Sequence, residues 1–127
     1  MNKETTPNIA IKVKTTYMPA QSDPANNQFV FSYTITIRND SAQAAKLLTR
    51  HWVITDGDNQ VQEVKGEGVV GMQPHLQPGE SFEYSSGCVL KTPVGVMQGS
   101  YQMIRDDSSL FDAPIAAFTL AIPNIFH

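Results

Sequence analysis

The strongest constraint in this sequence is a two-residue alternation of apolar and polar side chains. It is clearest in residues 29–38, where large apolar residues occupy every second position. These residues are Phe29, Phe31, Tyr33, Ile35 and Ile37. Because successive side chains of a β-strand point to opposite faces, the alternation predicts a strand with one face in a core. Residues 9–17 show the same pattern and predict a second strand.

The rest of the chain is a series of short apolar runs separated by turn residues. We expect further strands at residues 44–55, 61–65, 81–90, 101–104 and 115–122, with a turn between Gly95 and Gly99. Seven or eight strands without a helical period predict one all-β domain over residues 1–127. An immunoglobulin-like or fibronectin type III-like antiparallel β-sandwich fits best, with Trp52 packed between its sheets.

Charge and cysteine content exclude several classes of partner and location. Nine Lys and Arg against twelve Asp and Glu give a net charge of −3, without a basic run. Such a surface does not favour nucleic acid or anionic membranes. Cys88 is the only cysteine, so an internal disulfide is excluded. With neither a secretory signal nor a membrane-spanning segment in the sequence, we expect a cytoplasmic protein.

Residues 66–71, Gly-Glu-Gly-Val-Val-Gly, match the G-x-G-x-x-G pattern of dinucleotide-binding folds. In those folds a helix follows and its N-terminus binds the phosphates. Here Met72-Gln73-Pro74 follows instead, so we expect Gly66, Gly68 and Gly71 to serve a bulge, a tight bend or a close sheet contact. Phosphate binding by the backbone amides of this segment is kept as the alternative.

Two other patterns point to metals. Asp56 to Glu67 resembles a calcium loop, but its sixth position holds Val61 where Gly is needed, so a hairpin turn is expected. The three histidines, at positions 51, 75 and 127, have no local ligand spacing. We predict no dedicated metal site and no cofactor, with His75 and Glu80 as the only candidates for weak Co²⁺ or Mg²⁺ binding.

The sequence contains no convincing catalytic arrangement. Cys88 has no Cys-His signature around it and is expected to be a buried strand thiol. Ser85-Ser86-Gly87 lacks the context of a nucleophile elbow. We therefore expect a non-enzymatic protein, in which edge strands and proline-glycine loops offer docking places for a partner.

From Leu47 onward the chain resembles the ApaG family. The segments that carry the resemblance are Leu47-Leu48, Arg50-His51-Trp52, Ile54-Thr55-Asp56, Val64-x-Gly66-x-Gly68-Val69-Val70-Gly71-x-Gln73-Pro74, Leu76-x-Pro78-Gly79-Glu80-x-Phe82-x-Tyr84, Ser86-Gly87, Thr92-Pro93-x-Gly95-x-Met97-x-Gly99-x-Tyr101-x-Met103 and Phe118-x-Leu120-x-x-Pro123. The resemblance implies a fibronectin type III-like sandwich in a bacterial protein. Family members are commonly labelled Co²⁺/Mg²⁺ efflux proteins, and related eukaryotic domains look like protein-interaction modules.

These observations leave two hypotheses. The first is a binding or regulatory module that acts on another protein through residues 66–80 and is linked only indirectly to Co²⁺ and Mg²⁺ resistance. The second is direct binding of a polyphosphate nucleotide or a divalent cation by the same segment. The partner's identity stays open, as does homodimer formation: the long strand at residues 28–38 could lie at a sheet edge and pair with a second copy across a two-fold axis.

Overall fold

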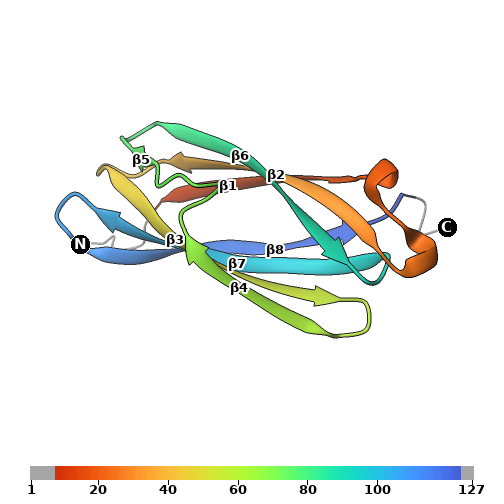
Figure 1. Cartoon of the computed structure of the whole chain (residues 1–127). Coiled ribbons are helices and arrows are strands. Elements are labelled where there is room, and N and C mark those ends of the chain that lie inside the picture. The colour runs from red at the N-terminus through yellow and green to blue at the C-terminus, as the bar shows by residue number, and fades with distance from the viewer. Residues whose placement is uncertain (1–7, 124–127) are drawn as a thin grey trace.

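The computed structural model describes residues 8–123, which form two antiparallel sheets packed face to face (Figure 1). The three-stranded sheet has the order β1-β2-β6, and the larger sheet has the order β4-β3-β7-β8, with the short β5 also paired to β3. The strands are β1 (Ile9–Tyr17), β2 (Phe29–Asn39), β3 (Ala45–Asp56), β4 (Val61–Glu67), β5 (His75–Leu76), β6 (Ser81–Leu90), β7 (Val94–Arg105) and β8 (Leu110–Ala121). The predicted antiparallel β-sandwich is confirmed. No helix within these residues is long and apolar enough to cross a membrane.

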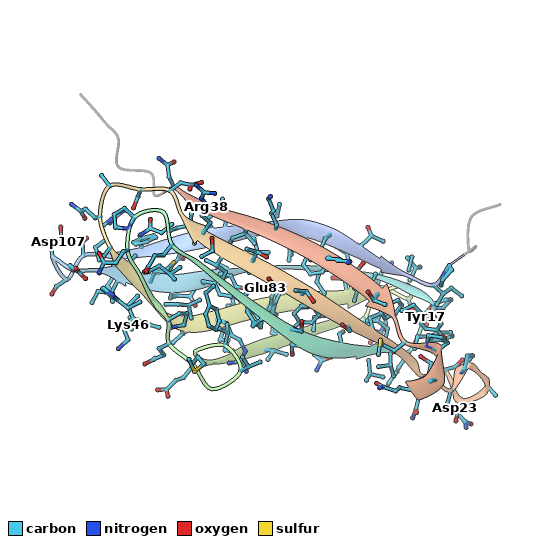
Figure 2. All side chains as sticks on the ribbon, turned by 90° about the horizontal axis from the view of Figure 1, so that it is seen from above. Tyr17, Asp23, Arg38, Lys46, Glu83 and Asp107 are labelled. Atoms are coloured by element: carbon cyan, nitrogen blue, oxygen red, sulfur yellow. The ribbon has the colours of Figure 1, made fainter. Side chains whose placement is uncertain are left out.

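Strand β2 lies in the middle of its sheet, which corrects one expectation. It pairs with β1 along one edge and with β6 along the other. Figure 2 looks down on this sheet, with Arg38 on β2 and Glu83 on β6 among the labelled residues. Both edges of β2 are occupied, so pairing of residues 28–38 with a second copy across a two-fold axis is wrong. The alternation of apolar residues predicted the strand correctly but did not predict its position in the sheet.

Trp52 is the centre of the core, as the sequence predicted. Its side chain is only 3% exposed and packs edge-on against Tyr33, Tyr101 and Phe118. Edge-to-face packing suits the charge distribution of aromatic rings and adds to the effect of apolar burial. Because Tyr33 comes from the three-stranded sheet and the other three from the larger one, this cluster joins the two layers.

The expected turn between Gly95 and Gly99 is wrong, because β7 runs through both glycines. Gly95 pairs with Asp56 and Leu120, while Gly99 pairs with Trp52 and Ile115. A Cβ at Gly99 would overlap the carbonyl oxygen of His51, so these glycines allow close approach of backbones rather than a reversal. Strand β8 also begins earlier than expected. It starts at Leu110, which pairs with Ile104 of β7.

Asn39, the last residue of β2, hydrogen-bonds to β5, to the segment that follows β5 and to the segment that follows β2. It is fully buried, and its Nδ2 donates to the carbonyl oxygens of Gln43 at 2.8 Å and Leu76 at 2.9 Å. Its Oδ1 accepts from the Ser41 amide at 3.0 Å. Its main chain is also bonded to residues 79 and 80. A single buried amide side chain thus connects β2 to β5, because each polar group must find a partner inside the protein.

Candidate functional site

The two sheets differ in width, and the difference opens one side of the sandwich. At one side β1 lies next to β8. From there the three-stranded sheet ends at β6, whereas the larger sheet continues through β3 to β4. The β3–β4 hairpin extends at the lower right of Figure 1, below β6. None of the residues of β4 is buried, and among residues 8–123 no strand lies opposite its inner face.

A cleft of about 370 Å³ occupies this open side. We call it the β4–β6 cleft. Its floor includes Arg50, Trp52 and Ile54, which are alternate residues of β3, and Tyr33 from β2. A neighbouring hollow of about 220 Å³ shares Ile54 with it and continues to Lys91. The two spaces therefore form one elongated groove between β4 and β6.

Among the described residues, Arg50 is the one charged residue that lines the cleft itself. Its Nη1 donates to the carbonyl oxygens of Glu67 at 3.0 Å and Gly68 at 2.9 Å. Gly66 makes this position available, because a Cβ there would lie 2.8 Å from Nη1. Within residues 8–123 the ion pairs join Arg38 to Asp40, His51 to Glu63 and His75 to Asp106, and none includes Arg50. The guanidinium is held in place without a neutralising carboxylate.

Burial keeps the Cys88 thiol, which lines the cleft, and two tyrosine hydroxyls of the core neutral. The Tyr84 and Tyr101 hydroxyls share a hydrogen bond of 2.6 Å, and burial raises the pKa of Tyr84 to about 12. Burial also raises the pKa of Cys88 to about 11, so the thiol is protonated at neutral pH. A protonated thiol is a poor nucleophile. The expectation of a buried strand thiol at Cys88 is confirmed.

The glycine-rich segment is a tight hairpin that follows β4. Val69 and Met72 exchange two backbone hydrogen bonds of 2.8 and 2.9 Å around Val70 and Gly71. Both central residues have positive φ, 42° at Val70 and 81° at Gly71, as a type I′ turn requires. Gly68 also has a positive φ, of 63°. The three predicted glycines thus serve a close contact with Arg50 and a tight bend.

The hairpin uses most of its amides internally. The amide of Gly68 donates to the Leu48 carbonyl at 2.8 Å, and the amides of Val69 and Met72 donate to each other's carbonyls. Strands, and no helix, follow the segment as far as residue 123. A row of convergent amides, such as phosphate-binding loops provide, is therefore not formed by these three groups. Phosphate contact by Gly66, Gly68 and Gly71 stays a prediction.

His75 and Glu80, the candidates for weak metal binding, have separate partners. His75 Nε2 lies 2.8 Å from Asp106 Oδ1, and Glu80 Oε1 accepts from the amide of Gln77 at 2.8 Å. Within residues 8–123 no group of three or more His, Cys, Asp or Glu side chains could hold a metal ion. His51 pairs with Glu63 across β3 and β4, and His127 lies outside the described residues.

The calcium-like segment after β3 is the hairpin turn that the sequence favoured. Asp56 Oδ1 accepts from the amides of Asp58 at 2.8 Å and Gln60 at 3.0 Å. Asn59 has the left-handed φ of 62° that such a turn needs. The carboxylate that would have been the first calcium ligand therefore stabilises the turn.

Comparison with known proteins agrees with the motifs. Residues 19–105 match the family described as the ApaG domain. This chain belongs to the ApaG domain family. Protein ApaG of Thiobacillus denitrificans is 61% identical over 119 residues, covering 94% of each chain. Protein ApaG of an Azoarcus species is 56% identical over 127 residues and the full length of both chains.

Solved structures show the same ApaG architecture. The crystal structure of a Bordetella pertussis protein named ApaA has a TM-score of 0.90 and 49% identity, covering 93% of this chain and 96% of the other. In the present structure, the ApaG segment Arg50-His51-Trp52 divides between two faces of β3. Arg50 and Trp52 line the cleft, whereas His51 bonds Glu63.

The sequence missed Arg50 as a site residue and Asn39 as an anchor. The motif around Trp52 was a signal for Arg50, because a basic residue two positions from a core tryptophan must share its face of the strand. For Asn39 the signal was its position at the end of the apolar alternation. Neither signal reveals the partner groups, which come from distant parts of the chain.

Proposed function

We propose that this ApaG domain is a non-enzymatic cytoplasmic binding module that acts through another protein. The β4–β6 cleft carries the proposal: it combines a guanidinium without an acidic partner, an aromatic and aliphatic floor, and strand edges. Edge strands that border apolar surface are common places for a partner chain to add. The cleft is suited to contact rather than to nucleophilic chemistry, since burial keeps the Cys88 thiol protonated.

We propose that the link to Co²⁺ and Mg²⁺ is indirect and passes through the partner. The choice of these two ions rests on the resemblance to the ApaG family. The imidazole and carboxylate that the sequence marked, His75 and Glu80, already bond other groups of this chain. The ions are then handled by the partner, and binding at the cleft regulates it.

Site-specific photocrosslinking in living cells tests the module. A benzophenone amino acid replaces Gln62, an exposed residue lining the cleft on β4. The matched control replaces Glu83, exposed on the outer face of β6 (Figure 2). We expect a discrete protein adduct from position 62 and none from position 83. Absence of any adduct at position 62, with the protein folded and expressed, contradicts the proposal.

Growth of cells in medium that contains Co²⁺ tests the indirect link to the metal ions. Cells lacking the gene should be more sensitive to Co²⁺ than cells that carry it, and an allele with Val64→Lys should fail to restore resistance. Val64 lines the cleft and is half-buried, so a charged side chain there obstructs it. Full resistance with this allele would separate the cleft from the metal phenotype.

A further inference from the structure

The wall that β6 contributes to the groove is its strand edge. Residues 86–91, from Ser86 to Lys91, line the cleft and the adjoining hollow without a gap. One face of a strand would contribute only every second residue, so an unbroken run indicates the edge of the backbone. Strand β6 pairs with β2 along its other side, from Phe29–Leu90 to Arg38–Ser81. Within the described residues, no further strand pairs with the cleft side.

The groove has the dimensions of an added strand. Six consecutive residues at about 3.3 Å each give a wall of about 20 Å. Strands of about six residues are the usual length in globular proteins. A fourth strand placed beyond β6 would also lie over the inner face of β4, where Val64 and Gly66 are only partly covered. The smaller sheet therefore lacks one strand on the side where the larger sheet continues.

Arg50 determines which chemical group the groove favours in an added strand. A guanidinium has five N–H groups, of which the structure uses those of Nη1 for the Glu67 and Gly68 carbonyl oxygens. Within residues 8–123, no hydrogen bond is made by Nε or Nη2. These two nitrogens form the pair that binds a carboxylate through two parallel hydrogen bonds. Asp56 and Lys91 lie in the adjoining hollow, so Arg50 is the charged group among the described residues that line the cleft itself.

We infer that the groove is an acceptor site for an extended segment of a partner protein, which pairs with the β6 edge and places an Asp or Glu carboxylate on Arg50. Backbone hydrogen bonds to residues 86–91 supply affinity that is independent of sequence, and Arg50 selects the acidic residue. Apolar side chains of the segment pack against Val64, which is half-buried in the lining of the cleft. This inference rests on the proposed function and names the chemistry of the partner.

Titration of the purified full chain with short peptides tests the inference without a cellular partner. The probes are acetylated and amidated peptides of about six residues, alternating Thr and Val, with one Glu placed at each position in turn. Matched probes carry Gln instead. We expect one register of the Glu series to bind at least about tenfold more tightly than its Gln counterpart. Amide exchange should slow in residues 86–91 when that peptide is bound.

Variants assign the selectivity to Arg50. Arg50→Gln should abolish the preference for Glu over Gln, and Arg50→Lys should restore part of it, because Lys keeps the charge but loses the paired donors. Arg38→Gln is the matched control, since Arg38 is exposed and pairs with Asp40 outside the cleft. Arg50→Lys also keeps a donor for the hairpin carbonyls, so a folding defect in Arg50→Gln does not remove the test.

Three results would overturn the inference. The first is equal affinity for Glu and Gln probes. The second is a full response to isobutyrate alone, without slower exchange in residues 86–91, which would mean a small-anion site. The third is a dimer whose 86–91 amides are already protected without peptide, which would make a second copy the occupant. Selective peptide binding with no crosslink at position 62 would instead leave the inference standing and count against the cellular function.

Discussion

The guanidinium of Arg50 lies directly over the backbone of Gly66, in the space that a side chain at residue 66 would fill. The two residues are also directly opposite each other in the register of β3 and β4. The first glycine of the G-x-G-x-x-G pattern is therefore explained by an arginine on the neighbouring strand.

Gly66→Ala should impair binding while the fold persists. The new Cβ would lie 2.8 to 2.9 Å from three atoms of the guanidinium, which is the flexible end of a side chain and can move. We expect a loss of stability of only about 1 kcal/mol, together with loss of the Glu preference in the peptide titration. Chemical denaturation and the titration measure the two effects. Unchanged selectivity would show that the position of Arg50 does not matter.

Gly68→Ala and Gly71→Ala should differ strongly, although both residues have positive φ. A Cβ at Gly68 would overlap the carbonyl oxygen of Met72, whereas a Cβ at Gly71 meets no atom within 4 Å. Gly71→Ala should cost about 1 kcal/mol for its left-handed backbone. Gly68→Ala should cost at least about 3 kcal/mol. Urea unfolding of the two variants is the measurement, and equal losses would contradict the close contact.

Val70→Asn should stabilise the protein. Val70 is a β-branched residue at φ 42°, and it is 58% exposed, so little packing is lost on replacement. Asn followed by Gly is the preferred pair for a type I′ turn. We expect a gain of about 1 kcal/mol in the free energy of unfolding. A loss of stability would mean that the exposed apolar side chain makes a contact that offsets the backbone strain.

Asn39→Ala should be among the most destabilising substitutions of a polar residue. It removes the donor from the buried carbonyl oxygen of Leu76, and one of two donors from the carbonyl oxygen of Gln43, which also accepts from the Ser41 hydroxyl. We expect a loss of about 3 kcal/mol, with faster amide exchange in β5. Asp40→Ala is the control, because Asp40 is exposed and should cost less than about 1 kcal/mol. Similar losses for the two variants would contradict the anchoring role.

Stability should decline in alkali from about pH 9 upward. The pKa of Cys88 is raised from 9.0 to about 11 and that of Tyr84 from 10.0 to about 12 by burial. Because the folded state holds these protons more tightly than the unfolded chain, their contribution is complete below the unfolded pKa values. It is lost as the pH rises through the folded values. Denaturation midpoints across this range check the decline, and Cys88→Ala should flatten its lower part.

The positions of several strands follow from local chemistry alone. Alternation places Ile35 and Ile37 in the core whatever lies beside them, because the pleat directs every second side chain to one face. The turn at Asp56 is equally local, since its carboxylate bonds amides only two and four residues away. These features are determined locally because the interacting groups are neighbours in the chain.

The order of strands in the sheets was decided only by the tertiary structure. Nothing in residues 28–38 shows that β6 occupies the second edge of β2, because the alternation describes which face is buried and not which strands flank it. The path of β7 through Gly95 and Gly99 was likewise missed, because it depends on backbones that approach from β3.

The sequence by itself determined an antiparallel sandwich, its core tryptophan and a tight bend at the glycine-rich segment. Only the tertiary structure placed Arg50 on Gly66 and left the β6 edge open above β4. The physical reason is that side-chain alternation and turn preferences are properties of adjacent residues. A cleft arises from the difference in width between two sheets, which is set by pairings between distant parts of the chain.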